Sequence, residues 1–336
     1  MTQNKKEEGI MKVRSLFFGI LISFCFLGMC FASKVVKLDC NAIYGPTSFH
    51  TQGAMEFAKL VKKYSKGTVI ISVHPGGALG FKGPELLKAV KDAQVPMSDI
   101  LMGVVAGSEH IFGVSSLPRL VKTYKDAREL YEDLKPLYKR AALKWNQKFL
   151  YAAPWPPSGL VTKKEIHTVS DLRGLKTRTY DKNGARFLKE LGASPVPMPW
   201  GEVYSSLRTG VIDSVLTSAE STKNGKFWEV LNCFAKINYA FPLNMMTMNL
   251  DYWKSLSKEQ QKAILKAARE IEDMQWKNSE NRNIESLKIL KQHGMKVYNP
   301  TKELNKAMDR AARKIIDEFM SKTRGRAKDI LKKYVK

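Results

Sequence analysis

The sequence predicts an α/β protein made of two lobes, in which helices pack on largely parallel sheets. Three observations support this prediction. The roughly 300 residues after position 33 exceed what one hydrophobic core organises comfortably. β-like runs alternate with helical segments in the first half of the chain, and the second half repeats that style. No internal repeat and no low-complexity linker occurs, so strands and helices must join the lobes.

The first 33 residues have the pattern of a secretory signal peptide. A short basic run, Met11–Arg14, precedes an apolar stretch from Leu16 to Ala32, which is shorter than the roughly 20 residues of a membrane helix. Small residues before Ser33 suit cleavage. We therefore expect residues 1–33 to be an upstream extension with a signal peptide. A retained anchor, or a lipoprotein attached at Cys30, is the alternative.

The chain is strongly basic. It has 56 Lys and Arg residues against 32 Asp and Glu residues, a formal net charge of +24. Loss of residues 1–33 removes four basic and two acidic residues and leaves +22. Basic residues are spread along the whole chain, and the export signal argues against a nucleic-acid partner. An anionic small ligand fits better, although the basic tail 321–336 keeps binding to an anionic polymer or lipid as an alternative.

The elements of the first half follow in order. An alternating strand begins near residue 34 and breaks at Gly45-Pro46. Apolar residues at helical spacing predict a helix over 51–65, and "GTVIISVHPGGALG" predicts a β-branched strand stopped by glycines. Pro84 begins the next helix. The resulting β-α-β-α order is typical of a layered α/β domain.

The second half continues in the same way. Residues 149–162 predict strands on either side of a proline-rich bend, and residues 175–180 and 211–218 predict two more strands. Helical patterns cover 183–191 and 201–209, and each pattern ends at a glycine.

The C-terminal part is helical. Ser257-Lys258-Glu259-Gln260 is a capping-box start, and helical spacing then runs to His293-Gly294, as one long helix or two in series. A last amphipathic segment spans 304–319.

Several catalytic and cofactor motifs are missing. Gly225-Lys226 is followed by Phe227, so no phosphate-binding P-loop is present, and the glycine cluster at 76–80 lacks dinucleotide-binding spacing. The histidines stand apart, with no Cys-x-x-Cys and no nucleophile elbow. We therefore expect no cofactor and no metal. Cys40 and Cys233 either pair in an oxidising compartment or remain free thiols.

Arg178 is the first candidate functional residue. It lies in the β-like run Leu175–Tyr180, where alternation puts Lys176, Arg178 and Tyr180 on one face. An unpaired buried charge is costly, and the planar guanidinium suits a carboxylate. An internal ion pair is the alternative.

Trp200 is the second candidate functional residue. It lies at a proline-stiffened entry to a helix, and it is either a wall of a ligand pocket or a core residue.

Four segments, taken in order, resemble one family. They are "FAKLVKKYSKGTVIISVHPGGALG" with "ELLKAVKDAQVPMSDI", "DLRGLKTRTY", "LGASPVPMPWGEVYSSLRTGVIDS" and "NMMTMNLDYWKSLSKEQQKAILKAA". The chain is similar to the extracytoplasmic substrate-binding proteins of TRAP transporters, of the DctP type, over about residues 40–320. The resemblance implies a periplasmic-binding-protein-like fold, with two α/β lobes around a central cleft, joined by crossing strands and a long helix.

The resemblance also implies lobe boundaries. We expect lobe 1 to comprise 34–154 and 243–282, and lobe 2 to comprise 155–242 and 283–336. The crossing strands near 154–156 and 241–244 are then the expected hinge.

The resemblance assigns roles to individual residues. Arg178 would form a salt bridge with the ligand carboxylate, and Trp200 would line the pocket. Polar contacts are expected after "GVID", and wall residues in the first-strand loop, in "MTMNLDYW" and in "PWPPSG". The complete expected site is Arg178, Trp200, Thr217, Ser218, Asn249, Asn41, Tyr44 and Trp155.

One departure from the family pattern bears on the ligand. Some members, notably those for sialic acid, carry a second arginine upstream, where this chain has Ser158. A highly charged dicarboxylate is then less favoured unless a lysine substitutes from elsewhere. Trp155 and Trp200 favour a flat, partly apolar or aromatic monocarboxylate.

The resemblance implies a function and partners. We expect a monomeric periplasmic binding protein without enzymatic activity, which delivers a small organic acid to TRAP permease subunits and binds no nucleic acid. The competing hypothesis is an exported enzyme that acts on an organic acid through Asp213, Glu202 and a histidine.

Overall fold

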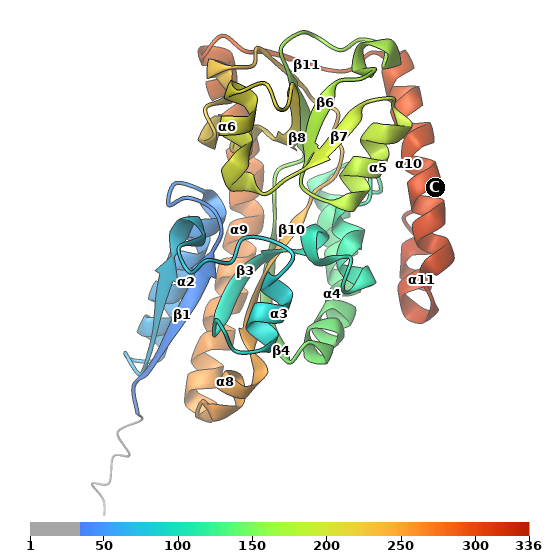
Figure 1. Ribbon diagram of the computed structural model, residues 1–336. Coiled ribbons are helices and arrows are strands. Elements are labelled where there is room, and N and C mark those ends of the chain that lie inside the picture. The colour runs from blue at the N-terminus through green and yellow to red at the C-terminus, as the bar shows by residue number, and fades with distance from the viewer. Residues whose placement is uncertain (1–33, 336) are drawn as a thin grey trace, which may run out of the picture. The chain divides into compact units, whose positions relative to one another are not determined.

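Two sheets organise the chain (Figure 1). The structure is a computed structural model that describes residues 34–335, so the predicted signal peptide lies outside the described residues. The first sheet has the strand order β2-β1-β3-β10-β4, formed by β1 (Val36–Ala42), β2 (Val69–His74), β3 (Met97–Leu101), β4 (Gln147–Pro154) and β10 (Leu243–Asn249). The second has the order β11-β9-β5-β8-β6-β7, formed by β5 (Ser158–Thr162), β6 (Lys176–Thr179), β7 (Ser194–Pro197), β8 (Ser214–Ser218), β9 (Cys233–Ala235) and β11 (Lys296–Tyr298).

Helices cover both sheets. They are α2 (Phe49–Tyr64), α3 (Leu86–Lys91), α4 (Tyr124–Lys144), α5 (Lys182–Glu190), α6 (Val203–Arg208), α7 (Ala219–Asn224), α8 (Leu250–Ser255), α9 (Lys258–Gln292), α10 (Lys302–Lys322) and α11 (Gly325–Lys332). None of the helices within residues 34–335 is both long and apolar enough to cross a bilayer.

The strand directions differ in part from the expected parallel sheets. β1, β2 and β3 run parallel, but β10 is antiparallel to both of its neighbours, and β5 is antiparallel to β8 and β9. The reason is that β4 leaves the first sheet and the chain enters the second sheet as β5, while β10 makes the return crossing. A strand that arrives from the other sheet must start at the edge where the parallel strands end.

The carboxyl ends of the parallel strands therefore face the crossing region. Open α/β sheets bind ligands outside these ends. The two crossings are tied together, because the Trp155 amide donates to the Pro242 carbonyl at 2.8 Å and the Ser158 amide donates to the Ala240 carbonyl at 3.0 Å. The Trp155–Pro242 bond lies within the expected hinge and the Ser158–Ala240 bond lies just beyond it, and the hinge role itself stays a prediction.

Helix α9 is the third connection. The predicted capping box is present, with Ser257 accepting from the Gln260 amide and the Gln260 side chain accepting from the Ser257 amide. The structure shows one 35-residue helix rather than two in series, and Gly294 follows it with a left-handed φ of +82°. α9 packs on α2 and β4 of the first sheet and on α7 beside the second (Figure 1).

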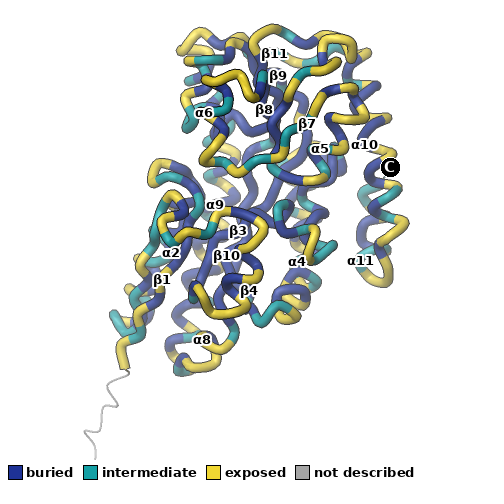
Figure 2. The backbone as a smooth tube through the Cα atoms, in the orientation of Figure 1, coloured by how far each residue is buried: buried dark blue, intermediate teal, exposed yellow. Residues whose placement is uncertain are grey.

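The core is continuous across the two sheets. One hydrophobic cluster lies between the first sheet and helices α2 and α9, and another lies under α6 on the second sheet. The largest cluster joins α4, α5 and α10 to strands of both sheets. Figure 2 shows the resulting buried strands and exposed outer helix faces. All strands fall inside the predicted lobe ranges, and the lobe boundaries remain a prediction.

The two cysteines within residues 34–335 are free and buried. Cys40 lies in β1 of the first sheet and Cys233 in β9 of the second. Burial raises the pKa of both thiols, which makes the reactive thiolate scarce.

We predict that the chain lacking residues 1–33 contains two thiols and no disulfide. Alkylation with iodoacetamide in denaturant without reductant should add two labels per chain by mass spectrometry. Alkylation of the native protein should be much slower, because Cys40 is 1% exposed. An unlabelled chain two hydrogens lighter would contradict the prediction.

A chain of two buried hydrogen bonds joins the centre of the first sheet to the crossing region. The Asp99 carboxylate in β3 accepts from Asn244 Nδ2 at 3.0 Å, and Asn244 Oδ1 accepts from Trp155 Nε1 at 2.8 Å. Burial raises the pKa of Asp99 from 3.8 to about 7, and the Asn244 hydrogen bond lowers it in part. Asp99 therefore favours folding in its protonated form and loses that contribution as pH rises through 7.

We predict that Asp99→Asn removes this pH dependence. The amide keeps an acceptor for Asn244 and has no charge to desolvate. The free energy of unfolding of the variant, minus that of the wild type, should rise between pH 4 and pH 7 by at most about 4 kcal/mol. Urea unfolding at several pH values measures this difference, and a difference independent of pH would refute it.

Candidate functional site

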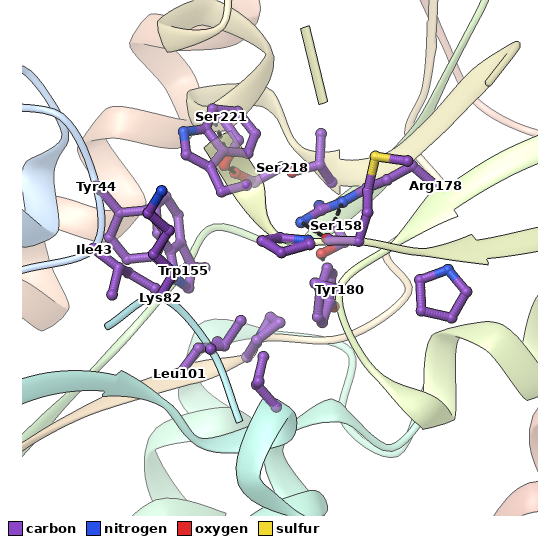
Figure 3. Close-up of a pocket in the computed structure, with 18 of the residues that line it drawn as sticks. Ile43, Tyr44, Lys82, Leu101, Trp155, Ser158, Arg178, Tyr180, Ser218 and Ser221 are labelled. Carbon is purple, nitrogen blue, oxygen red and sulfur yellow. Dashed lines mark hydrogen bonds between the residues drawn. The ribbon is translucent and has the colours of Figure 1, made fainter. Parts of the chain in front are cut away.

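A cavity of about 230 Å³ lies where the two sheets meet. Six of the eight predicted site residues line it: Arg178, Trp200, Thr217, Ser218, Tyr44 and Trp155. Figure 3 shows Tyr44 and Trp155 on one wall and Arg178 on the opposite wall. Most of the remaining lining is apolar, formed by Ile43, Leu101, Val104, Pro197, Met198, Pro199 and Pro242.

Arg178 is buried near the carboxyl end of β6. It is 4% exposed, and burial lowers the pKa of its guanidinium to about 10, so the group stays protonated at neutral pH. Its Nε and Nη2 donate to the Met198 carbonyl at 3.2 and 3.0 Å. The rings of Tyr180 and Trp200 lie 5.9 and 6.0 Å from the guanidinium carbon.

The ion-pair alternative for Arg178 is not borne out. Among the described residues, no carboxylate forms an ion pair with its guanidinium. Asp181 lies close enough to raise the pKa of Arg178, but its carboxylate caps α5 by accepting from the Gly184 amide at 2.8 Å. A buried cation with only a neutral carbonyl as its partner is a ready site for an anion.

The wall opposite Arg178 is aromatic and rigid. The Trp155 ring packs edge-on to Tyr44 at 4.9 Å and to Phe49 at 5.3 Å. His50 lies behind it with ring centroids 4.3 Å apart, and burial lowers the pKa of His50 to about 3, so this histidine is neutral. The Asn244 hydrogen bond fixes the indole orientation. The indole ring of Trp155 therefore forms a wall of the cavity and is held in one orientation.

Several hydroxyl groups line the same cavity as Arg178. Thr217 and Ser218 end β8, and Ser218 caps α7 by accepting from the Ser221 amide at 3.1 Å. Ser158 and Tyr180 share a hydrogen bond of 3.2 Å between their hydroxyl oxygens. These groups can donate to a carboxylate held by Arg178.

Asn249 does not reach the cavity, so the structure corrects its expected role. It lies at the end of β10 remote from Leu243, and its Oδ1 caps α8 by accepting from the Asp251 amide at 2.9 Å. Its Nδ2 donates to the carbonyls of Val90 and Lys91. Asn249 is a structural cap.

Asn41 also lies outside the lining. Its Nδ2 donates to the Phe81 carbonyl at 3.3 Å and lies 3.4 Å from Ser98 Oγ. Asn41 thus supports the loop that follows Phe81 instead of facing the cavity.

Sequence reasoning missed four lining residues that carry polar groups: Lys82, Ser158, Tyr180 and Ser221. Tyr180 had a signal, because alternation placed it on the same face as Arg178. Ser158 was noted only as a missing arginine. Lys82 had no signal, since it lies in a loop without periodicity and reaches the cavity only through the tertiary fold.

The residues of the enzyme hypothesis are not assembled. Asp213 accepts from the Lys176 amide at 3.1 Å, and Glu202 is exposed in the short 3-10 turn Trp200–Glu202. Neither lines the cavity, and within residues 34–335 the lining contains no histidine, cysteine or carboxylate. The cavity offers cations, hydroxyls and apolar walls, which suit binding.

Comparison with known proteins agrees with this chemistry. Residues 41–323 match the family of bacterial extracellular solute-binding proteins, family 7, named DctP. The sialic acid-binding periplasmic protein SiaP of Vibrio cholerae is 24% identical, over 81% of this chain and 85% of that protein.

Solved structures extend the comparison. A marine metagenome TRAP solute-binding protein specific for pyroglutamate is 30% identical, with a TM-score of 0.86 over 90% of this chain and 99% of that one. An extracytoplasmic solute receptor of Bordetella pertussis that binds pyroglutamic acid is 28% identical, with a TM-score of 0.86 over 89% and 99%. The two-lobe fold predicted from the sequence is confirmed. The chain thus belongs to the DctP family of TRAP transporter solute-binding proteins.

Proposed function

We propose that the protein captures a small organic acid by a salt bridge between Arg178 and the ligand carboxylate. The observation that carries the proposal is the buried guanidinium, which has no carboxylate partner within the part of the chain that the structure describes. A ligand carboxylate would supply the missing charge and accept hydrogen bonds from the guanidinium nitrogens that Met198 leaves available. The low dielectric of the cavity strengthens such bonds.

The cavity favours a compact and partly apolar acid. Its volume of about 230 Å³ is below the usual range for drug-sized ligands. Trp155 and Trp200 can each cover a flat ring, while proline and aliphatic side chains fill the rest of the wall. The two pyroglutamate-binding relatives bind a small ring with one carboxylate. We therefore propose a monocarboxylate of this size, aromatic or otherwise flat, with pyroglutamate as the first candidate.

The proposal places the protein in transport. The family is extracytoplasmic, and we propose that residues 1–33 direct export to the periplasm. We further propose that a monomer closes its two lobes about the hinge at 154–156 and 241–244 and delivers the acid, chemically unchanged, to TRAP permease subunits. Ligands that touch both lobes favour the closed form.

We predict that Arg178→Ala lowers the affinity for the bound acid at least about 100-fold, because truncating one partner of a buried, hydrogen-bonded charge pair is costly. Native mass spectrometry of the purified wild type identifies any retained acid, and calorimetry with that acid or with pyroglutamate gives Kd. Arg208→Ala, an exposed arginine of α6, is the matched control and should bind like the wild type.

Two further measurements accompany the affinity measurement: the melting temperature of the variant and the recovery of the acid. The melting temperature of ligand-free Arg178→Ala should equal or exceed that of the wild type, because a buried unpaired charge has been removed. The acid should also be recovered unchanged after long incubation with the protein. Wild-type affinity in the folded Arg178→Ala variant would reject the salt bridge, and conversion of the acid would favour an enzyme.

We predict that Trp200→Ala weakens binding of ring acids about tenfold, through lost stacking and apolar contact. Acetate or propionate, which cover little of the ring with their one or two additional carbons, should lose less affinity. Trp228→Ala is the control, because Trp228 is half-buried like Trp200 but stacks on His293 at 3.9 Å outside the cavity. Equal losses of affinity for ring acids and for short-chain acids would contradict the proposed contact between Trp200 and the ligand ring.

A further inference from the structure

The cavity has a second cation, and it comes from the other sheet. Lys82 lies in the loop between β2 and α3 and lines the cavity together with Arg178 of β6. Figure 3 shows Lys82 beside Tyr44, across the cavity from Arg178. Among the described residues, its ammonium has no carboxylate partner. In the sequence, Ser158 replaces the second arginine of some relatives, and a lysine from elsewhere could substitute for it.

The loop that carries Lys82 is held in place on both sides. Asn41 Nδ2 donates to the Phe81 carbonyl at 3.3 Å, immediately before Lys82. The Glu85 carboxylate accepts from the Lys82 amide at 2.6 Å and from the Gly83 amide at 3.0 Å. Glu85 thus binds the backbone of the loop and does not pair with the Lys82 ammonium.

The side chain of Lys82 lies against a glycine turn. A Cβ built on Gly77 would stand 3.0 Å from Lys82 Cγ and 3.5 Å from Cε, and Gly77 has a φ of +69°. Glycine adopts this left-handed conformation without strain, and a side chain at this position would crowd the lysine. The aliphatic stem of Lys82 therefore packs against the turn, while Lys82 as a whole remains exposed at the edge of the cavity.

We propose that Lys82 binds a second oxygen acceptor of the ligand, at the end opposite to the carboxylate held by Arg178. This inference rests on the proposed function, the salt bridge at Arg178, and adds one requirement to the ligand class, a second oxygen acceptor, which in a dicarboxylate would extend the class beyond monocarboxylates. The acid would carry an oxygen at each end, with a short apolar middle or ring against Ile43, Leu101 and Val104. A carbonyl oxygen and a second carboxylate share this chemistry.

The experiment compares acids that differ in the second acceptor. Pyroglutamate and cyclopentanecarboxylate share a five-membered ring, and only pyroglutamate has a ring carbonyl. Glutarate and pentanoate share a five-carbon chain, and only glutarate has a second carboxylate. Calorimetry or competition binding gives Kd for each acid with the wild type, Lys82→Gln and Lys82→Arg.

The wild type should prefer the two-acceptor member of at least one pair. Lys82→Gln should reduce that preference about tenfold, which is typical of a hydrogen bond to a partly exposed charge. Binding of cyclopentanecarboxylate and pentanoate should not change, and Lys82→Arg should restore most of the preference. Lys254→Gln, an exposed lysine of α8 outside the cavity, is the matched control.

The two acceptor sources give different results. If the acceptor is a second carboxylate, the Lys82-dependent preference appears for glutarate over pentanoate and falls as salt is added. If it is a neutral carbonyl, the preference appears for pyroglutamate and depends little on salt.

Failure of the inference can be told from failure of the proposed function. If Lys82→Gln binds every acid as the wild type does, or weakens all of them equally, Lys82 does not select a second acceptor, while the Arg178 site stands. If the wild type binds no acid of either pair and carries none on purification, both are overturned.

Discussion

A buried arginine without an internal anion is the constraint on which the cavity depends. Removing the Arg178 guanidinium from water costs free energy that a carboxylate would normally offset. Here the Met198 carbonyl and two aromatic faces offset only part of it. The site is therefore less stable empty than occupied, and an acid that binds there also stabilises the fold. The same desolvation that makes the empty site costly would make the proposed salt bridge with a ligand carboxylate strong.

The proline-rich strand beside Arg178 explains how the charge keeps one orientation. β7 is the edge strand of the second sheet, where prolines are tolerated because one side of the strand has no partner. Pro197 and Pro199 fix φ on both sides of Met198, and the Met198 amide donates to the Thr179 carbonyl at 3.3 Å. The Met198 carbonyl is thus held toward the guanidinium. The stretch "PVPMPW" is a support for Arg178 as well as an entry to Trp200.

Local patterns predicted most of the fold, whereas the expected site came largely from the family resemblance, and six of its eight residues line the cavity. Arg178, Trp200 and Thr217 sit in elements whose ends the sequence marks with glycine, proline or alternation. The direction of β10 could not be read in this way, because it depends on the chain returning from the second sheet. The wall role that the resemblance implied for Asn249 was therefore not matched, because Asn249 ends β10 on the side remote from the cavity and caps α8. Lys82 was missed for a related reason, since a lysine in an exposed loop looks the same whether it faces solvent or a cleft.

The two cations also bear on how the lobes respond to ligand. Lys82 extends from the first sheet and Arg178 from the second, and no carboxylate among the lining residues lies between them. Bringing the walls together without an anion raises the repulsion between the two charges, and exclusion of water makes that repulsion larger. A bound acid reverses the sign of the interaction, because both cations are then attracted to the ligand. An equilibrium between open and closed forms shifts only by the difference in ligand affinity between them. With one cation on each wall, the proposed binding of an acid to both would favour the closed form by that difference.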